Sequence, residues 1–219
     1  KNMYFAPHQS NGTITDLVPG RNYVFQIQAH TKVGGGSKAL WEETMPIWAP
    51  PQPEDSVVPT EVSHSSNAIK TRLRKNYFSN IYGPVIAYTL IVAEDSSKPS
   101  NQLELPSWFD VQANFVWPPY QAIDPFYPFN SSIVEDFIIG SSDCSDSRSN
   151  EKYYCNGPLK PGTNYKIKIR AFTAHDKFTD TVYSQAITTD ADNTAIFVGI
   201  FLPLTLLTLL AVTMIFMKQ

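Results

Sequence analysis

The sequence predicts an all-β protein that ends in one membrane-spanning helix, and three observations support this prediction. Aromatic residues make up 13% of the chain and proline occurs 17 times, a balance that favours strands and turns over helices. Several short segments alternate apolar and polar residues, which is the pattern of half-buried strands. The run 195–217 is different, because it is apolar throughout and contains no charged residue.

The run 195–217 has the length of a transmembrane helix. At a rise of about 1.5 Å per residue it would extend roughly 35 Å, slightly more than the ~30 Å hydrocarbon core of a bilayer. Asp190 and Asp192 precede it and Lys218 follows it, so the positive-inside rule puts residues 1–194 outside the cell and starts a cytoplasmic tail at 218–219. The sequence therefore predicts a single-pass type I protein of the plasma membrane, held in the lipid bilayer through 195–217.

Two features fit an extracellular location. Cys144 and Cys155 are the two cysteines of the chain, and in an oxidising compartment a pair so close in sequence is expected to form one disulfide. Asn11 and Asn130 each begin an Asn-X-Ser/Thr tripeptide, which makes them predicted glycan acceptors.

One motif occurs twice and organises the predicted strands. Both copies have the form Leu-x-Pro-Gly-x-Asn-Tyr, and an alternating segment follows each of them at 24–29 and 166–171. The Pro-Gly pair makes a turn, and the Tyr can place its ring in the core while its hydroxyl returns to the upstream backbone. We therefore predict two tyrosine corners, with these key residues: Leu17, Pro19 and Tyr23; Leu159, Pro161 and Tyr165.

At these corners the chain resembles the fibronectin type III family, and the resemblance implies seven-stranded antiparallel sandwiches. Residues 1–46 contain only the later strands of such a module, so we expect them to be its C-terminal half and the chain to be a fragment of a longer protein. A Pro-rich linker is expected at 47–56, because proline favours extended backbone and cannot continue a sheet. A second, membrane-adjacent module is expected at 57–190.

The second module contains more chain than a fibronectin module needs, and the excess, about 95–137, is rich in aromatic residues. This insertion either covers the sandwich as added core or presents a surface to a partner or the membrane. We favour the cover, because so many large apolar groups are costly to expose. If it is a surface, its partner is an unidentified extracellular protein or glycan, and its residues are Trp108, Phe109, Trp117, Tyr120, Phe126 and Tyr127.

The sequence contains no recognised catalytic arrangement. It has no Gly-x-Ser-x-Gly elbow, and no Cys-x-x-Cys or His-x-x-x-His spacing that would hold a metal. Its four histidines are scattered along the chain, at His8, His30, His64 and His175. We therefore expect this chain to have no enzyme activity, cofactor or metal ion of its own. A net charge of −3 and a pI near 5.8 do not suggest nucleic acid as a partner either.

Three further patterns have simple interpretations. The glycines 34–36 suit a flexible turn between strands better than a phosphate loop. Four loop carboxylates lack the spacing of a calcium-binding loop and are better explained as solvated groups; they are Asp143, Asp146, Asp190 and Asp192. One basic strip suits the solvent face of a strand, with heparan sulfate or a lipid headgroup as the alternative ligand; it comprises Lys70, Arg72, Arg74 and Lys75.

Segments 77–88, 158–173 and 178–184 together resemble the membrane-adjacent region of the R3 class of receptor-type protein tyrosine phosphatases. The resemblance implies fibronectin modules outside the cell, one span, and a cytoplasmic domain that dephosphorylates phosphotyrosine or inositol phospholipids. For the member that the chain most resembles, it also implies a place at the shaft connectors of hair-cell stereocilia. The His-Cys-x-x-Gly-x-x-Arg signature of these enzymes is absent from the sequence, so no catalytic residue can be assigned.

The resulting hypothesis is a juxtamembrane and anchoring segment of a receptor phosphatase that serves adhesion or ligand presentation. A non-enzymatic adhesion or cytokine-type receptor is the main alternative, although the Trp-Ser-x-Trp-Ser motif of the cytokine class is absent. An extracellular hydrolase on a sandwich scaffold is the third.

Overall fold

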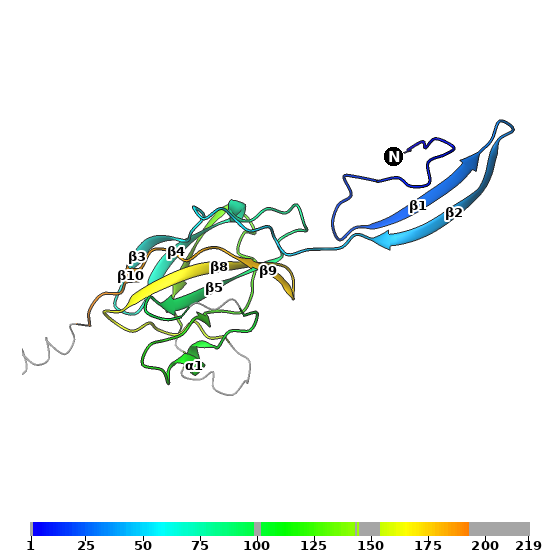
Figure 1. The fold of residues 1–219 in the computed structure, drawn as a ribbon. Helices are drawn as coiled ribbons and strands as arrows, with labels where there is room; N and C mark the ends of the chain where they lie inside the picture. Colours follow the sequence, from blue (N-terminus) through cyan, green and yellow to red (C-terminus); the bar gives the residue numbers. More distant parts are fainter. Residues whose placement is uncertain (1, 99–101, 143, 145–153, 193–219) are drawn as a thin grey trace, which may run out of the picture.

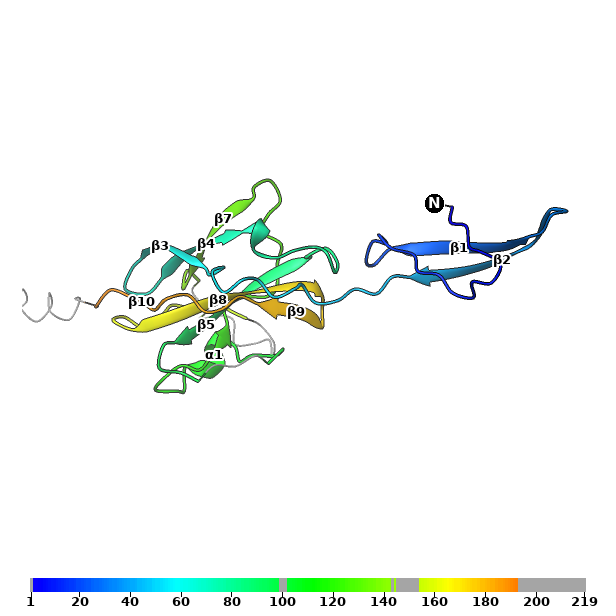
Figure 2. The ribbon, with the colours of Figure 1, turned by 45° about the horizontal axis from the view of Figure 1, so that its top comes forward.

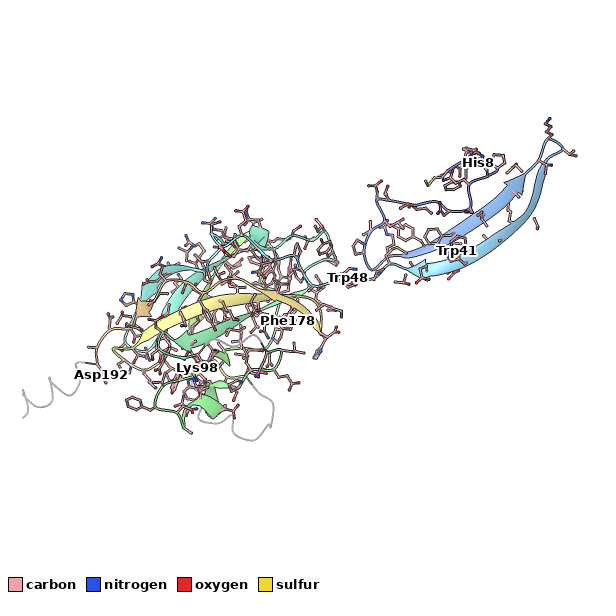
Figure 3. The ribbon with its side chains drawn as sticks, viewed as in Figure 1. His8, Trp41, Trp48, Lys98, Phe178 and Asp192 are labelled. Atoms are coloured by element: carbon pink, nitrogen blue, oxygen red, sulfur yellow. A yellow bond between two sulfur atoms is a disulfide. The ribbon has the colours of Figure 1, made fainter. Side chains whose placement is uncertain are left out.

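The computed structural model describes residues 2–98, 102–142, 144 and 154–192. They form two β regions, a long hairpin near the N-terminus and a sandwich, which an extended segment around Trp48 connects (Figures 1 and 3). The connection between them is short and continuous in both ribbon views (Figures 1 and 2).

The hairpin consists of β1 (Asn22–His30) and β2 (Gly35–Thr44), which pair antiparallel. Gly34, at φ 151°, lies in the turn between them, so the glycines at this position make a turn. Phe25 and Trp41 are directly opposite each other and their rings stack at 5.0 Å. No second sheet covers this pair in the described residues, and Trp41 is 48% exposed.

The sandwich has two sheets. One has the strand order β3-β4-β7, and the other the order β10-β8-β5-β6 with β9 also paired to β8. The strands of the first sheet are β3 (Thr60–His64), β4 (Ile69–Arg74) and β7 (Val134–Ile139). Those of the second are β5 (Ala87–Glu94), β6 (Tyr120–Gln121), β8 (Asn164–Ala174), β9 (Lys177–Asp180) and β10 (Ile187–Thr188). Both sheets are antiparallel, and the chain changes sheet between β4 and β5, β6 and β7, and β7 and β8, as in a fibronectin-like sandwich.

Alternation of apolar and polar side chains decides which face of each strand meets the core. In β4, Ile69, Thr71 and Leu73 are buried, whereas Lys70 and Arg72 between them are half-buried and Arg74 is exposed. Leu90 from β5 and Ile167 from β8 meet them from the second sheet and are fully buried. The core therefore lies between the two sheets, as period-2 patterning requires.

The prediction of a transmembrane helix as part of the fold needs correction. Within the described residues, no helix is long and apolar enough to cross a membrane. The α-helix α1 (Trp108–Val111) is one turn, held by a capping box between Ser107 and Asp110, and the other helix, the 3-10 turn η1, spans Lys75–Tyr77. One α-helical turn extends only about 6 Å, against the ~30 Å of a bilayer core. The run 195–217, its expected lipid contact and the expected tail 218–219 lie outside the described residues.

The linker packs against the sandwich rather than spanning free space. The Trp48 backbone N–H donates to the Tyr82 carbonyl oxygen at 3.0 Å, and Thr173 Oγ1 donates to the Trp48 carbonyl oxygen at 2.6 Å. A Cβ on Gly20 of the hairpin region or on Gly83 of the sandwich would lie 2.9 Å from the Ile47 side chain. Ile47 is therefore in close contact with both regions.

Candidate interaction surfaces of the sandwich

The aromatic residues of the insertion mostly cover the sandwich. Trp117 is 3% exposed and Tyr120 1% exposed, and their rings meet edge to face at 5.8 Å. Trp117 also packs against Tyr165 of the second corner, with ring centroids 6.2 Å apart. Of the two interpretations of the insertion, the structure favours the cover.

The four remaining residues of the expected surface, Trp108, Phe109, Phe126 and Tyr127, are each partly buried. Trp108 Nε1 donates to the Pro158 carbonyl oxygen at 3.0 Å, and its indole lies so close to Gly157 that a Cβ there would collide with it. Tyr127 packs on Tyr88, with ring centroids 6.0 Å apart. The six residues therefore do not form one exposed aromatic face.

A lysine fixes the outer end of the insertion. Lys160 Nζ lies 2.5 Å from Glu94 Oε1, donates to the Phe115 carbonyl oxygen at 2.7 Å, and sits 4.8 Å from the centroid of the Trp117 ring. Glu94 is buried. A partly buried ion pair of this kind, with additional hydrogen bonds, holds the insertion against the second corner.

The second corner itself has the local geometry that its motif implies. The Lys160 backbone N–H donates to the Tyr165 hydroxyl at 3.0 Å. In the hairpin, the Val18 backbone N–H donates to the Tyr23 hydroxyl at 2.9 Å. Burial raises the pKa of the Tyr165 hydroxyl well above its usual range. Each corner therefore has the same type of hydrogen bond, from a backbone N–H to the Tyr hydroxyl, although the surroundings of the two corners differ.

Two cations on the side of β8 that faces away from the core are buried, and the sequence analysis did not predict this. Lys168 and Arg170 are 2% and 0% exposed, and Asp180 contacts both, at 2.6 Å and 2.7 Å. The Arg170 guanidinium carbon lies 3.9 Å from the centroid of the Phe178 ring, and Lys168 Nζ lies 5.1 Å from that of Tyr183. Burial raises the pKa of the Tyr183 hydroxyl to about 12. The alternation of basic residues was visible in the sequence, but the rings and the carboxylate that cover them come from β9 and beyond.

The basic strip on β4 is largely neutralised. Arg72 donates from Nε and Nη2 to the two carboxylate oxygens of Asp136, at 2.7 Å and 3.1 Å, and Lys70 Nζ lies 3.4 Å from the same carboxylate. These bonds hold the pKa of Asp136 below its usual value. Only Arg74 and Lys75 extend the strip beyond this cluster, so the structure gives little support to a polyanion site here.

No group of three or more His, Cys, Asp or Glu side chains in the described part of the chain is arranged to hold a metal ion. His64 lies 2.5 Å from Glu61 and 3.4 Å from Asp190, and Asp192 lies near the end of the described residues. Asp143 and Asp146 lie outside them.

Cys144 and Cys155 are joined in a disulfide. The predicted glycan acceptors Asn11 and Asn130 are both exposed.

The sequence of this chain is similar to a family model and to two known proteins. Residues 73–191 match the family model described as "TM proximal of protein tyrosine phosphatase, receptor type J". The chain is 28% identical over 186 residues to phosphatidylinositol phosphatase PTPRQ of Rattus norvegicus and 28% identical over 188 residues to that of Homo sapiens. Both alignments cover 79% of this chain, which spans only 8% of the length of these relatives.

Among solved structures, the chain is similar to the crystal structure of chicken CNTN1 FN1–FN3 domains. The sequence identity is 15% and the TM-score is 0.34, over 80% of this chain and 44% of that one.

Proposed function

We propose that this chain, which belongs to the family of membrane-proximal regions of receptor-type protein tyrosine phosphatases, is the non-catalytic segment of such a receptor next to the membrane. One observation carries the proposal. The matched residues 73–191 begin at the end of β4 and finish just after β10, so they include the insertion and every strand of the sandwich except β3 and most of β4.

The segment would act as a spacer that serves adhesion or ligand presentation and joins extracellular modules to a phosphatase on the other side of the membrane. The linker supports this role, because its hydrogen bonds to Tyr82 and Thr173 attach it to the sandwich. The relatives are named phosphatidylinositol phosphatases. These names favour inositol phospholipids, with phosphotyrosine as the alternative, as the substrate of the connected enzyme. The resemblance to the R3 class adds hair-cell stereocilia as a proposed place of action.

The described residues would lie outside the cell, in the type I orientation. A disulfide between Cys144 and Cys155 is favoured in an oxidising compartment. Asn11 and Asn130 are exposed, as glycan acceptors must be. The hairpin at 1–46 would be the C-terminal half of a preceding fibronectin module, whose other strands would cover the Phe25–Trp41 face.

Glycan mapping in mammalian cells tests the location. The chain, tagged at its N-terminus, should be labelled on intact cells by an antibody to the tag. Asn11→Gln and Asn130→Gln should each remove one glycosidase-sensitive mass increment, and the double variant should remove both. Asn101, which does not begin an acceptor tripeptide, supplies the control substitution Asn101→Gln. Absence of both surface label and glycans would contradict the extracellular assignment.

Replacement in a full-length receptor tests the spacer role. Exchanging the segment for a flexible linker of equal length should leave phosphatase turnover on a soluble phosphate ester unchanged but reduce the effect of the extracellular modules on cell adhesion. Unchanged adhesion would contradict a spacer. A coding sequence that continues past Gln219 without the phosphatase signature would favour the non-enzymatic adhesion receptor instead.

A further inference from the structure

We propose that Phe115, at the outer end of the aromatic insertion, inserts into the headgroup region of the adjacent lipid bilayer. The inference rests on the membrane-proximal location proposed above, and it assigns the surface that faces the lipid.

Phe115 is the exposed aromatic residue of an insertion whose other aromatic side chains are buried or partly buried. Its side chain is 96% exposed, whereas Trp117, two residues away, is 3% exposed. The neighbouring Val116 adds apolar surface at 36% exposure.

The Phe115 backbone is fixed in place. Its carbonyl oxygen accepts a hydrogen bond from Lys160 Nζ at 2.7 Å, and the same ammonium pairs with the buried Glu94. On the other side, the Asn114 backbone N–H donates to the Val111 carbonyl oxygen of α1 at 2.9 Å. The side chain is therefore presented outward from an anchored turn, which lowers the conformational cost of binding.

The hydrogen bonds also locate Phe115 at one end of the sandwich. β6 pairs with β5 through Val92 and Tyr120, so residues before Tyr120 run beyond the C-terminal end of β5. Thr189, the residue directly after β10, lies at that same end. Its Oγ1 donates a hydrogen bond to the Lys160 carbonyl oxygen at 2.7 Å. Phe115 therefore lies at the end from which the chain leaves towards Asp192.

The linker lies at the opposite end. Figure 3 shows the labelled Trp48 and Asp192 on opposite sides of the sandwich, and Trp48 is bonded to Thr173 at the far end of β8. In a membrane-proximal module the end with Asp192 faces the membrane. Phe, like Trp and Leu, is one of the apolar side chains with which peripheral segments enter the boundary between headgroups and acyl chains.

The charges around Phe115 select the lipid. The Asp95 and Asp190 side chains are 54% and 61% exposed at this end, whereas the cation beside Phe115, Lys160, is paired with Glu94. This mixture does not favour anionic lipid, so the contact is apolar and suits a zwitterionic phosphatidylcholine surface.

Lipid quenching tests the contact in the whole chain. Phe115→Trp and Val33→Trp each place a new indole at a fully exposed apolar position; Val33 is 99% exposed in the hairpin turn. The chain is added to phosphatidylcholine vesicles with acyl chains brominated near the headgroup, and the wild-type emission is subtracted. We expect quenching of the indole at 115 and none at 33.

A binding measurement gives the second readout. Phe115→Ser should lower the vesicle partition coefficient about tenfold, while Phe115→Leu should keep it near the wild-type value. Equal quenching at 115 and 33 would overturn the proposal, as would no quenching at 115 when wild type still floats with vesicles. Failure of the wild type to float would overturn the membrane-proximal function as well. Binding of a protein at Phe115 without any quenching by lipid would also overturn the proposed lipid contact.

Discussion

The hairpin and the sandwich contain the same tyrosine corner in very different surroundings. In both, the backbone N–H five residues upstream donates to the Tyr hydroxyl, at 2.9 Å for Tyr23 and 3.0 Å for Tyr165. Tyr165 is fully buried, whereas Tyr23 lies on a two-stranded sheet whose Ile27 is 57% exposed. The corner is therefore a local motif, and its contribution to stability depends on whether a second sheet packs over it.

Truncation of a Trp in each region should give the largest difference. Trp117→Ala removes a 3% exposed ring from the core and should destabilise the sandwich by about 3–5 kcal/mol. Trp41→Ala removes a 48% exposed ring and should cost less than about 1 kcal/mol. Urea unfolding, monitored through the NMR signals of each region, measures both losses of stability. Similar costs would show that the hairpin is packed as tightly as the sandwich.

Loss of a buried carboxylate should have the next largest effect. Asp180→Asn removes the charge that Lys168 and Arg170 contact, and both cations are almost fully buried. Since uncompensated buried charge is costly, we expect about 3 kcal/mol of destabilisation. The matched control is Asp136→Asn on the exposed face of β7, where the pair with Arg72 should contribute well under about 1 kcal/mol. Equal losses in thermal unfolding would argue against the buried cluster.

Removal of the corner hydroxyl compares the two regions directly. Tyr165→Phe leaves the Lys160 backbone N–H without its acceptor in a partly buried site and should cost about 1–3 kcal/mol. Tyr23→Phe should cost less, because water can reach the Val18 N–H in the exposed hairpin. Amide hydrogen exchange at Lys160 and Val18 reports each bond. If exchange accelerates at Val18 more than at Lys160, the comparison is wrong.

The smallest expected effect is a pH dependence at His64. The hydrogen bond and charge of Glu61, with a further contribution from Asp190, raise the pKa of His64 above its usual value. Stabilisation is therefore fully present below the unfolded pKa, about 6.5, and is lost as pH rises through the folded pKa. NMR titration should show this raised pKa, and Glu61→Gln should lower it more than Asp190→Asn does. An unchanged titration in Glu61→Gln would exclude the pairing.

Much of the fold could be predicted because strand patterning is local. The alternation at Ile69, Thr71 and Leu73 predicts the buried face of β4, and the repeated corner motif predicts the entry to β1 and β8. The transmembrane helix was also inferred from a local pattern, and the described residues contain no such helix. The surface of the insertion could not be predicted, because nothing local separates the buried Trp117 from the exposed Phe115.

The sequence alone determined the strand periods, the two corners and the pair of cysteines, since each depends on neighbouring residues or simple spacing. Only the tertiary structure decided which charges and rings meet. Lys160 contacts Glu94 across 66 positions of sequence, and the linker is bonded to Thr173 across 125. Such contacts depend on how two sheets and an insertion pack in three dimensions, and no local pattern encodes that packing.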